Sequence, residues 1–364
     1  GLMAEREQGI TIDVAYRYFA TPARKFIIGD SPGHIQYTRN MVTAASNADL
    51  AVLLVDARHG LQAQTRRHAY LANWAAIPRV VLAVNKMDLV DGSQDSFNRI
   101  RDEFQQFSTQ LEFDEVLAIP ISALHGDMVV ERGTIVSWYR GPTLLEYLET
   151  VPVTDHESAK PFRFPVQRVL RIAGGNVQPG SGYEKSDCRG YQGTIASGQV
   201  FVGQEVVALP GGARARIAEI LTADGPIAQA FAGMAVTVRL DPETDVSRGD
   251  LIASASEAPS VRSEFDAELC WFDAEPFDRD RQYLIKQGTT TARVKLASVR
   301  HHVDITVARP VAPREMLAMN DIAGVALRAQ RPLVFDPYRE NRGTGAFIII
   351  DESSNHTVAA GTIV

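Results

Sequence analysis

Three short segments of the chain are almost entirely apolar. They are LAVLLVD (50–56), RVVLAVN (79–85) and VLAIPIS (116–122). Unbroken runs that are rich in β-branched residues are typical of parallel strands covered on both faces. By contrast, DVAYRYF (13–19) is half polar, which predicts an edge strand.

The stretches between these predicted strands carry the period of an α-helix. Apolar side chains recur at steps of three and four residues from Phe97 to Leu111, which predicts an amphipathic helix with Ser93 as its N-cap. The segment PTLLEYLETV (142–151) predicts a second helix, with Pro142 in its first turn. Strands that alternate with helices in this way favour a doubly wound parallel sheet.

From about Pro152 onward the helical period disappears, and Pro and Gly recur at short intervals. The segment GTIASGQVFVGQEVVAL (193–209) predicts two strands joined at Ser197 and Gly198, with Gly203 as a kink or bulge. Further β-rich runs predict strands at 235–240, 291–299 and 347–350.

These patterns divide the chain into three parts. We expect an α/β domain over residues 1–152, with a parallel sheet and flanking helices, followed by two small antiparallel β-barrels over 153–258 and 259–364. The segment EAPSV (257–261) is the expected join between the barrels. A chain of 364 residues agrees with this multidomain fold class, because two or three domains are usual at that length.

The composition argues against some classes of protein but does not indicate a function. Hydrophobic residues make up 45% of the chain and charged residues 22%, as in ordinary soluble globular proteins. Because no apolar run reaches roughly 18 residues and no secretory signal opens the sequence, we expect no membrane association and a cytoplasmic location. A formal charge of −7 gives no support for stable nucleic-acid binding. Cys188 and Cys270 form no CxxC motif, and we expect both thiols to be buried by packing in a reduced compartment.

Distinctive polar motifs follow three apolar runs that read as strands. They are DSPGH (30–34), after KFII (25–28), NKMD (85–88) and SAL (122–124). The carboxyl ends of parallel strands meet at one edge of an open sheet, and ligands collect there. We therefore expect one site to gather all three motifs.

The segment NKMD has the chemistry to read a guanine base. Guanine presents its N1–H and N2 amine side by side, and the Asp88 carboxylate can accept both hydrogen bonds, whereas adenine would leave that charge unpaired. We expect Asn85 to tie the loop segments together and the stem of Lys86 to lie along the base. In SAL, we expect Ser122 to shape the turn and a backbone N–H near Ala123 to meet the guanine O6. Taken alone, Asn-Lys-x-Asp is equally typical of a polar turn at a strand end.

The segment DSPGH suits the phosphate end of a nucleotide. Asp30, at a strand terminus, can hold Mg²⁺ through water, and Gly33 has no Cβ, so its N–H can approach a terminal phosphate. His34 can orient the attacking water that phosphoryl transfer needs. Upstream, Thr11 in GITID (9–13) offers a hydroxyl and a carbonyl to Mg²⁺ and phosphate. Judged alone, His34 is more typical of a helix start and Thr11 of a strand, so the order of all four motifs carries the prediction.

Taken together, these motifs resemble the translation-factor class of GTPases, with switch I at GITID, switch II at DSPGH and base-reading motifs at NKMD and SAL. The β-rich half is similar to the second and third domains of that class. More narrowly, AEREQGITIDVAYRYF (4–19) and GHIQYTRNM (33–41) resemble the large, GTP-hydrolysing subunit of sulfate adenylyltransferase, and residues 331–361 resemble the end of that subunit.

The resemblance implies a P-loop GTPase-type domain that uses GTP and Mg²⁺. It implies a partner, the small catalytic subunit, which makes adenosine 5′-phosphosulfate and pyrophosphate from ATP and sulfate, driven by GTP hydrolysis. His34 is then the catalytic residue, and Thr11 and Asp30 hold the metal. The GTP-binding residues carried over from the family motifs are Asp30, Gly33, Asn85, Lys86, Asp88, Ser122, Ala123 and Leu124.

The chain departs from the family pattern in three respects. Ser31 stands where Thr is common, and Ile35 stands where an acidic residue is common. The GxxxxGK[ST] phosphate loop does not occur in the 364 residues, and we expect it to precede Gly1. The alternative, an elongation factor that delivers aminoacyl-tRNA, is disfavoured by the acidic net charge and by QYTRNM (36–41).

Overall fold

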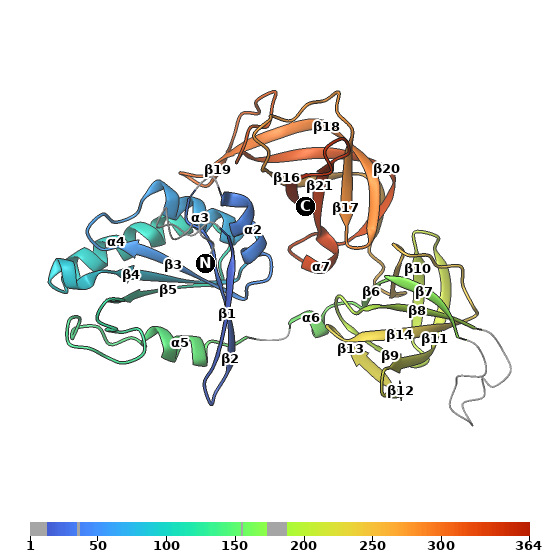
Figure 1. The fold of residues 1–364 in the computed structure, drawn as a ribbon, viewed down its shortest axis with the longest axis horizontal. Helices are drawn as coiled ribbons and strands as arrows, with labels where there is room; N and C mark the ends of the chain where they lie inside the picture. The colour runs from blue at the N-terminus through green and yellow to red at the C-terminus, as the bar shows by residue number, and fades with distance from the viewer. Residues whose placement is uncertain (1–12, 35–36, 154–155, 173–187) are drawn as a thin grey trace. The chain divides into compact units, whose positions relative to one another are not determined.

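Three parallel strands form the central sheet of the first of two compact units in the computed structural model (Figure 1). They are β3 (Leu50–Asp56), β4 (Arg79–Asn85) and β5 (Glu115–Pro120), which confirms the predicted parallel strands. The expected cover on both faces holds for β4 but is wrong for β3, where Val52 and Leu54 are exposed. The first unit comprises residues 1–153 and 303–311, and the second comprises 154–302 and 312–364. The structure describes residues 13–34, 37–153, 156–172 and 188–364.

Helices α3 (Ala63–Trp74) and α4 (Gln94–Ser108) pack against this sheet. The Ser93 side chain accepts a hydrogen bond of 3.2 Å from the Ser96 N–H, which confirms the predicted helix and its N-cap. The apolar stripe of α4 is buried, as its period requires. Leu111 is also buried, but it lies beyond the end of the helix.

Helix α5 (Leu144–Thr150) begins two residues later than the sequence predicts. Thr143 is its N-cap and forms a capping box with Glu146, in which each side chain bonds the other residue's N–H. The prediction that Pro142 lies in the first turn is therefore wrong. Pro142 precedes the cap, because the threonine hydroxyl satisfies a helix N–H that a proline cannot.

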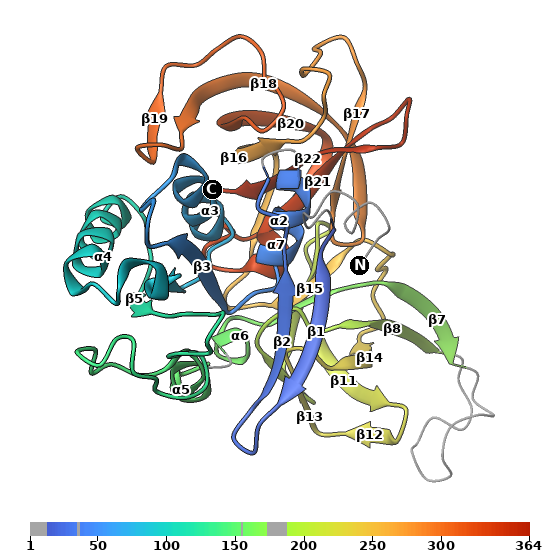
Figure 2. The same ribbon diagram turned by 60° about the vertical axis from the view of Figure 1, so that its left-hand side comes forward.

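Strands β1 (Ala15–Ala20) and β2 (Lys25–Asp30) form a separate antiparallel hairpin (Figure 2). In the described residues β1 pairs with β2 alone, as predicted for an edge strand. The Arg24 guanidinium ties the hairpin tip to the end of α5, through bonds of 2.8 Å to the carbonyls of Leu148 and Val151. After β2 the chain enters α2 (Thr38–Ala45). DSPGH thus follows a strand outside the three-stranded sheet, which corrects the expectation of one shared sheet edge.

An antiparallel sheet of eight strands forms the first half of the second unit. Its interior is apolar and includes Phe162, Phe164 and Tyr191, all buried. The short helix α6 (His156–Ala159) precedes it. Its strands are β6 (Arg163–Pro165), β7 (Arg168–Ile172), β8 (Cys188–Thr194), β10 (Glu205–Leu209), β11 (Ala213–Thr222), β12 (Gly225–Ile227), β14 (Ala235–Asp241) and β15 (Leu251–Ser254).

The segment 193–209 crosses three strands instead of forming the predicted pair. Its first residues end β8, its middle forms β9 (Gln199–Phe201), which pairs with β13 (Gln229–Phe231), and its last residues form β10. Gly203, with φ of +91°, lies in the turn between β9 and β10 rather than within a strand. A positive φ favours glycine, which explains the residue at this turn. At the turn the chain passes from the β9–β13 pair to the eight-stranded sheet.

A closed ring of six antiparallel strands forms the rest of the second unit, because β17 pairs with both β18 and β21. Its core includes Trp271, Phe265 and Phe347. This closed barrel and the α/β unit confirm the predicted fold class. The ring with its neighbours comprises β16 (Ser260–Trp271), β17 (Tyr283–Gln287), β18 (Thr290–Asp304), β19 (Arg309–Val311), β20 (Ile322–Phe335), α7 (Arg342–Gly345), β21 (Ala346–Asp351) and β22 (Thr357–Ile363). Of these, β19 and the end of β18 are counted with the first unit.

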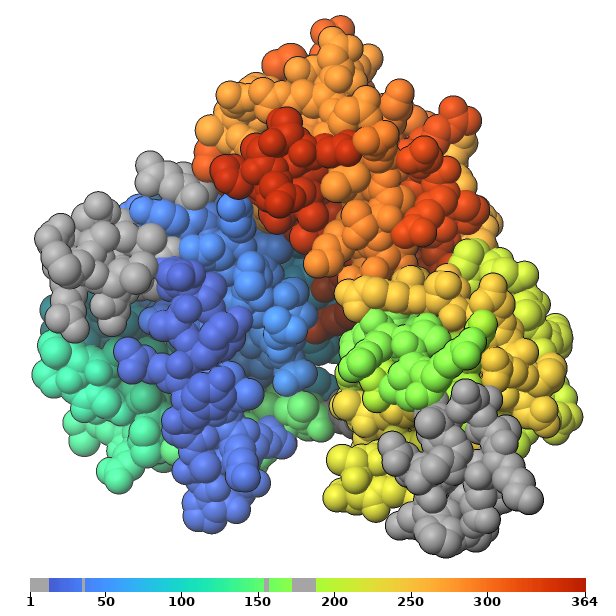
Figure 3. Space-filling model, turned by 45° about the vertical axis from the view of Figure 1, so that its right-hand side comes forward, coloured from blue at the N-terminus to red at the C-terminus, as the bar shows by residue number. Residues whose placement is uncertain are grey.

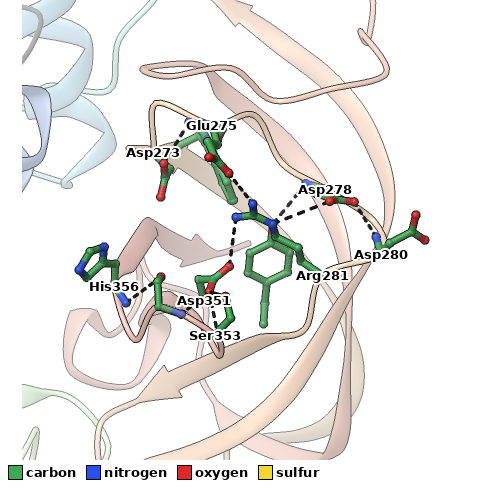
Figure 4. Close-up of polar contacts among 11 residues, drawn as sticks. Asp273, Glu275, Asp278, Asp280, Arg281, Asp351, Ser353 and His356 are labelled. Atoms are coloured by element: carbon green, nitrogen blue, oxygen red, sulfur yellow. Dashed lines mark hydrogen bonds and ion pairs between the residues drawn. The ribbon is translucent and has the colours of Figure 1, made fainter.

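An exposed group of acidic residues on this barrel is organised by one arginine (Figure 4). The Arg281 guanidinium pairs with Glu275, Asp278 and the buried Asp351. Backbone N–H groups of Ser353 and Ser354 also donate to Asp351, and side-chain and backbone hydrogen bonds from this turn lower its pKa to about 2. The group therefore links turns of the barrel to one another. The described residues contain no cluster of three or more His, Cys, Asp or Glu that could hold a metal.

Two remaining expectations concern boundaries and cysteines. Strand β15 ends at Ser254 and β16 begins at Ser260, while the domain boundaries at 152 and 258 stay predictions. Cys188 and Cys270 are both buried thiols, as predicted. Among the described residues, none of the helices is long and apolar enough to span a bilayer.

Candidate nucleotide site

The parallel register brings two polar residues side by side at the carboxyl edge of the sheet. Asp56 is the last residue of β3 and Asn85 the last of β4, and the two are register partners. The apolar body of β4 is fully buried from Val80 to Val84. The polar side chains therefore emerge where the strands leave the core, which is the edge at which ligands bind open sheets.

The Asn85 side chain links the two loops that the sequence assigns to the base. Its Oδ1 accepts hydrogen bonds from the backbone N–H groups of Ala123, at 3.0 Å, and Lys86, at 2.7 Å. The fully buried Met87 donates its N–H to the carbonyl of Ile121 at 3.2 Å, which adds a second link. The Ala123 N–H is thus engaged by Asn85 here, and its contact with a guanine O6 stays a prediction.

The Asp88 carboxylate is held from the second loop. The Ser122 hydroxyl donates to Asp88 Oδ1 at 2.6 Å and accepts from the His125 N–H at 3.4 Å. The bond from Ser122 lowers the pKa of Asp88, so this carboxylate is ionised at neutral pH. The sequence predicts that Ser122 shapes the turn and belongs to the GTP-binding residues. Its hydroxyl in fact also orients the acidic side chain of NKMD, while Leu124 beside it is exposed.

Lys86 has a partner that the sequence analysis missed. Its ammonium lies 2.9 Å from Asp56 Oδ2, and its backbone is left-handed, with φ of +65°. Arg58 binds the same carboxylate through Nε and Nη2, and these bonds hold the pKa of Asp56 well below its usual range. The sequence contains a signal for this partner, because Asp56, like Asn85, is the last residue of a predicted strand.

The predicted phosphate-end residues are exposed. Asp30 is the last residue of β2, and Gly33 and His34 lie in the turn before α2, where the His34 carbonyl accepts from the Tyr37 N–H at 2.9 Å. Figure 3 shows the neighbouring hairpin, in dark blue, on the surface of the first unit. Of the residues that the structure describes, a Cβ placed on Gly33 would meet only His68, at an ordinary 3.7 Å from Cε1. The protein itself therefore does not require glycine there, and a requirement would come from a ligand.

Two residues of α3 contact this turn. Gln64 Nε2 donates to the Gly33 carbonyl at 2.5 Å and lies 3.0 Å from His68 Nε2. Burial lowers the pKa of His68, which favours its neutral form. Neither residue was singled out from the sequence, since no motif rule covers a contact between a helix and a distant turn.

Two parts of the predicted site differ in how far they are assembled. NKMD and SAL are joined by side-chain bonds, whereas DSPGH follows a strand of another sheet. An exposed carboxylate such as Asp30 fits a cation that keeps most of its waters, as Mg²⁺ does. Thr11, the other predicted metal residue, lies outside the described residues.

Two known domain families match the sequence. The Elongation factor Tu GTP binding domain matches residues 1–153, and the GTP-eEF1A C-terminal domain-like family matches residues 264–364. The structure of Sup35 complexed with GDP is similar to the whole chain, with a TM-score of 0.50, 23% identity, and coverage of 96% of this chain and 83% of that one. At that identity the likeness shows a shared fold.

Curated relatives match the chain end to end. The bifunctional enzyme CysN/CysC of Mycobacterium tuberculosis is 50% identical over all of this chain, and sulfate adenylyltransferase subunit 1 of Chromobacterium violaceum is 47% identical. The chain spans 58% of the length of the first relative and 74% of the second. Bifunctional enzyme NodQ of Rhizobium tropici, at 48% identity, is covered over 55% of its length.

Proposed function

Since this chain belongs to the sulfate adenylyltransferase subunit 1 family, we propose that it is part of the regulatory GTPase subunit of that enzyme. In this role it binds and hydrolyses GTP. The hydrolysis drives a partner catalytic subunit to make adenosine 5′-phosphosulfate and pyrophosphate from ATP and sulfate. The relatives named subunit 1 support the existence of a second subunit.

The single observation that carries the nucleotide assignment is the linkage of NKMD to SAL. An ionised Asp88, oriented by Ser122, can accept hydrogen bonds from the guanine N1–H and N2 amine. Asn85 holds the opposite loop at a fixed distance from it. Lys86 would lie along the base, with Asp56 controlling the direction of its side chain.

Residues of DSPGH would act on the phosphates. The Gly33 N–H would donate to the γ-phosphate, and Asp30, with Thr11, would hold Mg²⁺. The metal, when bound, would neutralise charge that develops on the β- and γ-phosphate oxygens. His34 would hold the attacking water in line with the γ-phosphate, and its exposed position leaves room for that water.

The proposal is tested with the full-length protein and its catalytic subunit. GTP turnover is measured with both subunits, and ATP and sulfate are each omitted in turn. We expect turnover to be highest when ATP and sulfate are both present, with phosphosulfate formed alongside. Replacing GTP by ITP, which lacks the N2 amine, should weaken binding and so controls for base recognition.

An elongation-factor role predicts a different result in the same assay. Turnover would then be indifferent to sulfate, and aminoacyl-tRNA would bind tightly in the GTP state. That outcome would refute the proposed function. The names of relatives at 46–50% identity favour the sulfate enzyme.

A further inference from the structure

Gln64 holds one particular peptide group of the DSPGH turn. The carbonyl that it contacts belongs to the peptide bond between Gly33 and His34, and the distance from Gln64 Nε2 to that oxygen is 2.5 Å. Glycine has no Cβ to restrict its backbone, so this peptide can rotate freely about the ψ angle of Gly33 unless something outside the turn holds it. Pro32 restrains the chain on the other side and is buried.

The neighbouring histidine determines which way the Gln64 amide points. A carbonyl oxygen can only accept, so the Gln64 atom that contacts it is the amide nitrogen, which can only donate. The same nitrogen lies 3.0 Å from His68 Nε2, which accepts its second hydrogen when the His68 ring carries its proton on Nδ1. Burial lowers the pKa of His68 and so favours the neutral ring, which in that tautomer holds the amide in the orientation that Gly33 needs.

We propose that Gln64, oriented by His68, is a positioning residue for His34 in GTP hydrolysis. Gln64 holds the Gly33 carbonyl and so fixes the plane of the peptide between Gly33 and His34. This restraint limits the directions in which the His34 imidazole can hold water. This inference rests on the proposed function, because it assumes that His34 positions the attacking water. Small errors in the placement of a reacting group cost large factors in rate, so a restraint of this kind has a measurable effect.

Two substitutions of Gln64 test the proposal in the full-length protein. Gln64→Met removes the donor without adding charge, and Gln64→Glu keeps the shape but places an acceptor against the carbonyl. We expect each to lower kcat for GTP hydrolysis about tenfold, with KM and the affinity for GDP within about twofold of the natural protein. A merely structural role for Gln64 would instead weaken GDP binding and turnover together.

Gln62 supplies the matched control. It is the N-cap residue of α3, its side chain donates to the His59 carbonyl at 3.1 Å, and it has no bond to Gly33. Gln62→Glu adds the same charge to the same end of the helix. We expect its kcat to stay within about twofold of the natural protein. An equal loss in Gln62→Glu and Gln64→Glu, with none in Gln64→Met, would overturn the proposal in favour of a charge effect.

Combining the substitution with His34→Ala separates this inference from the function on which it rests. If Gln64 acts through His34, then Gln64→Met should cause no further loss of turnover in a His34→Ala background. Independent, multiplying losses would refute the positioning role while leaving the function intact. If instead His34→Ala alone turns over GTP as the natural protein does, the assigned role of His34 fails first.

Discussion

The two ends of the candidate nucleotide site differ in what holds their residues. At the base end, Asn85 and Asp88 are each bonded to the loop that follows β5, through Ala123 and Ser122. At the phosphate end, Asp30 and His34 are exposed on a turn that follows an antiparallel hairpin. The base end is therefore built from strands that share one parallel sheet, while the phosphate end follows a hairpin outside that sheet and leads into α2, which packs against α3.

This difference has a physical basis. Strands β3, β4 and β5 pair along their length, so the loops at their ends start from positions that the core sets. Strand β2 pairs with β1, and its Ile27 and Ile28 are exposed. A turn on such a strand has fewer fixed neighbours, and a single contact such as that of Gln64 then matters more.

The largest expected effect comes from breaking the base end. Asp88→Asn replaces one acceptor oxygen by a donor, so the guanine N1–H and N2 amine lose their charged partner, and GTP affinity should fall about a thousandfold. Affinity for xanthosine triphosphate, which has an acceptor where guanine has a donor, should rise. Fluorescence titration with both nucleotides measures the change.

Asp91→Asn is the control for this substitution. It removes the same charge three residues later, from an exposed position whose left-handed backbone an asparagine accepts. We expect wild-type nucleotide selectivity. If Asp88→Asn also keeps its preference for GTP, its role in base recognition is wrong.

A smaller effect, on rate alone, is expected at the phosphate end. His34→Ala should lower GTP turnover about a hundredfold with little change in GTP affinity, because the side chain would act on the attacking water. Since His34 is exposed, the substitution should leave folding intact. Single-turnover hydrolysis and equilibrium binding separate the two quantities. The exposed His356, on the second unit, provides a control alanine variant, and unchanged turnover in His34→Ala would contradict the assignment.

The smallest effect tests whether the base end is preassembled by Ser122. Ser122→Ala removes the bond to Asp88 and should weaken GTP binding about tenfold. Because that bond lowers the pKa of Asp88, its loss raises the pKa toward the ordinary range. Only the ionised Asp88 carboxylate can accept the guanine N1–H and N2 amine on both of its oxygens, so as pH falls the variant should lose GTP affinity at a higher pH than the natural protein.

Ser108→Ala is a suitable comparison for that titration. The Ser108 hydroxyl donates within α4, to the Gln105 carbonyl at 2.9 Å, and is remote from the NKMD motif in sequence. Its affinity should follow the natural pH profile. Coincident profiles for Ser122→Ala and the natural protein would show that the hydroxyl does not control Asp88.

Much of the fold was predictable because its signals are local. The buried strand β4 appears in the sequence as an unbroken apolar run. The buried stripe of α4 appears as apolar residues spaced three to four positions apart. Burial in a core selects both patterns directly. The errors fell where a hydrogen bond or a backbone angle outweighed a residue preference. Thr143 caps α5 and leaves Pro142 outside the first turn, and a turn at Gly203, which has a positive φ, separates β9 from β10 in different sheets.

The sequence by itself determined the candidate chemistry: which side chains could read guanine, which could meet phosphate, and their order along the chain. Tertiary structure decided which of them meet. The register of β3 with β4 paired Asp56 with Lys86, and the loops after β4 and β5 brought Ser122 to Asp88. These contacts join residues far apart in the chain, and their partners are fixed by strand pairing and packing rather than by local pattern, so no spacing along the sequence reveals them.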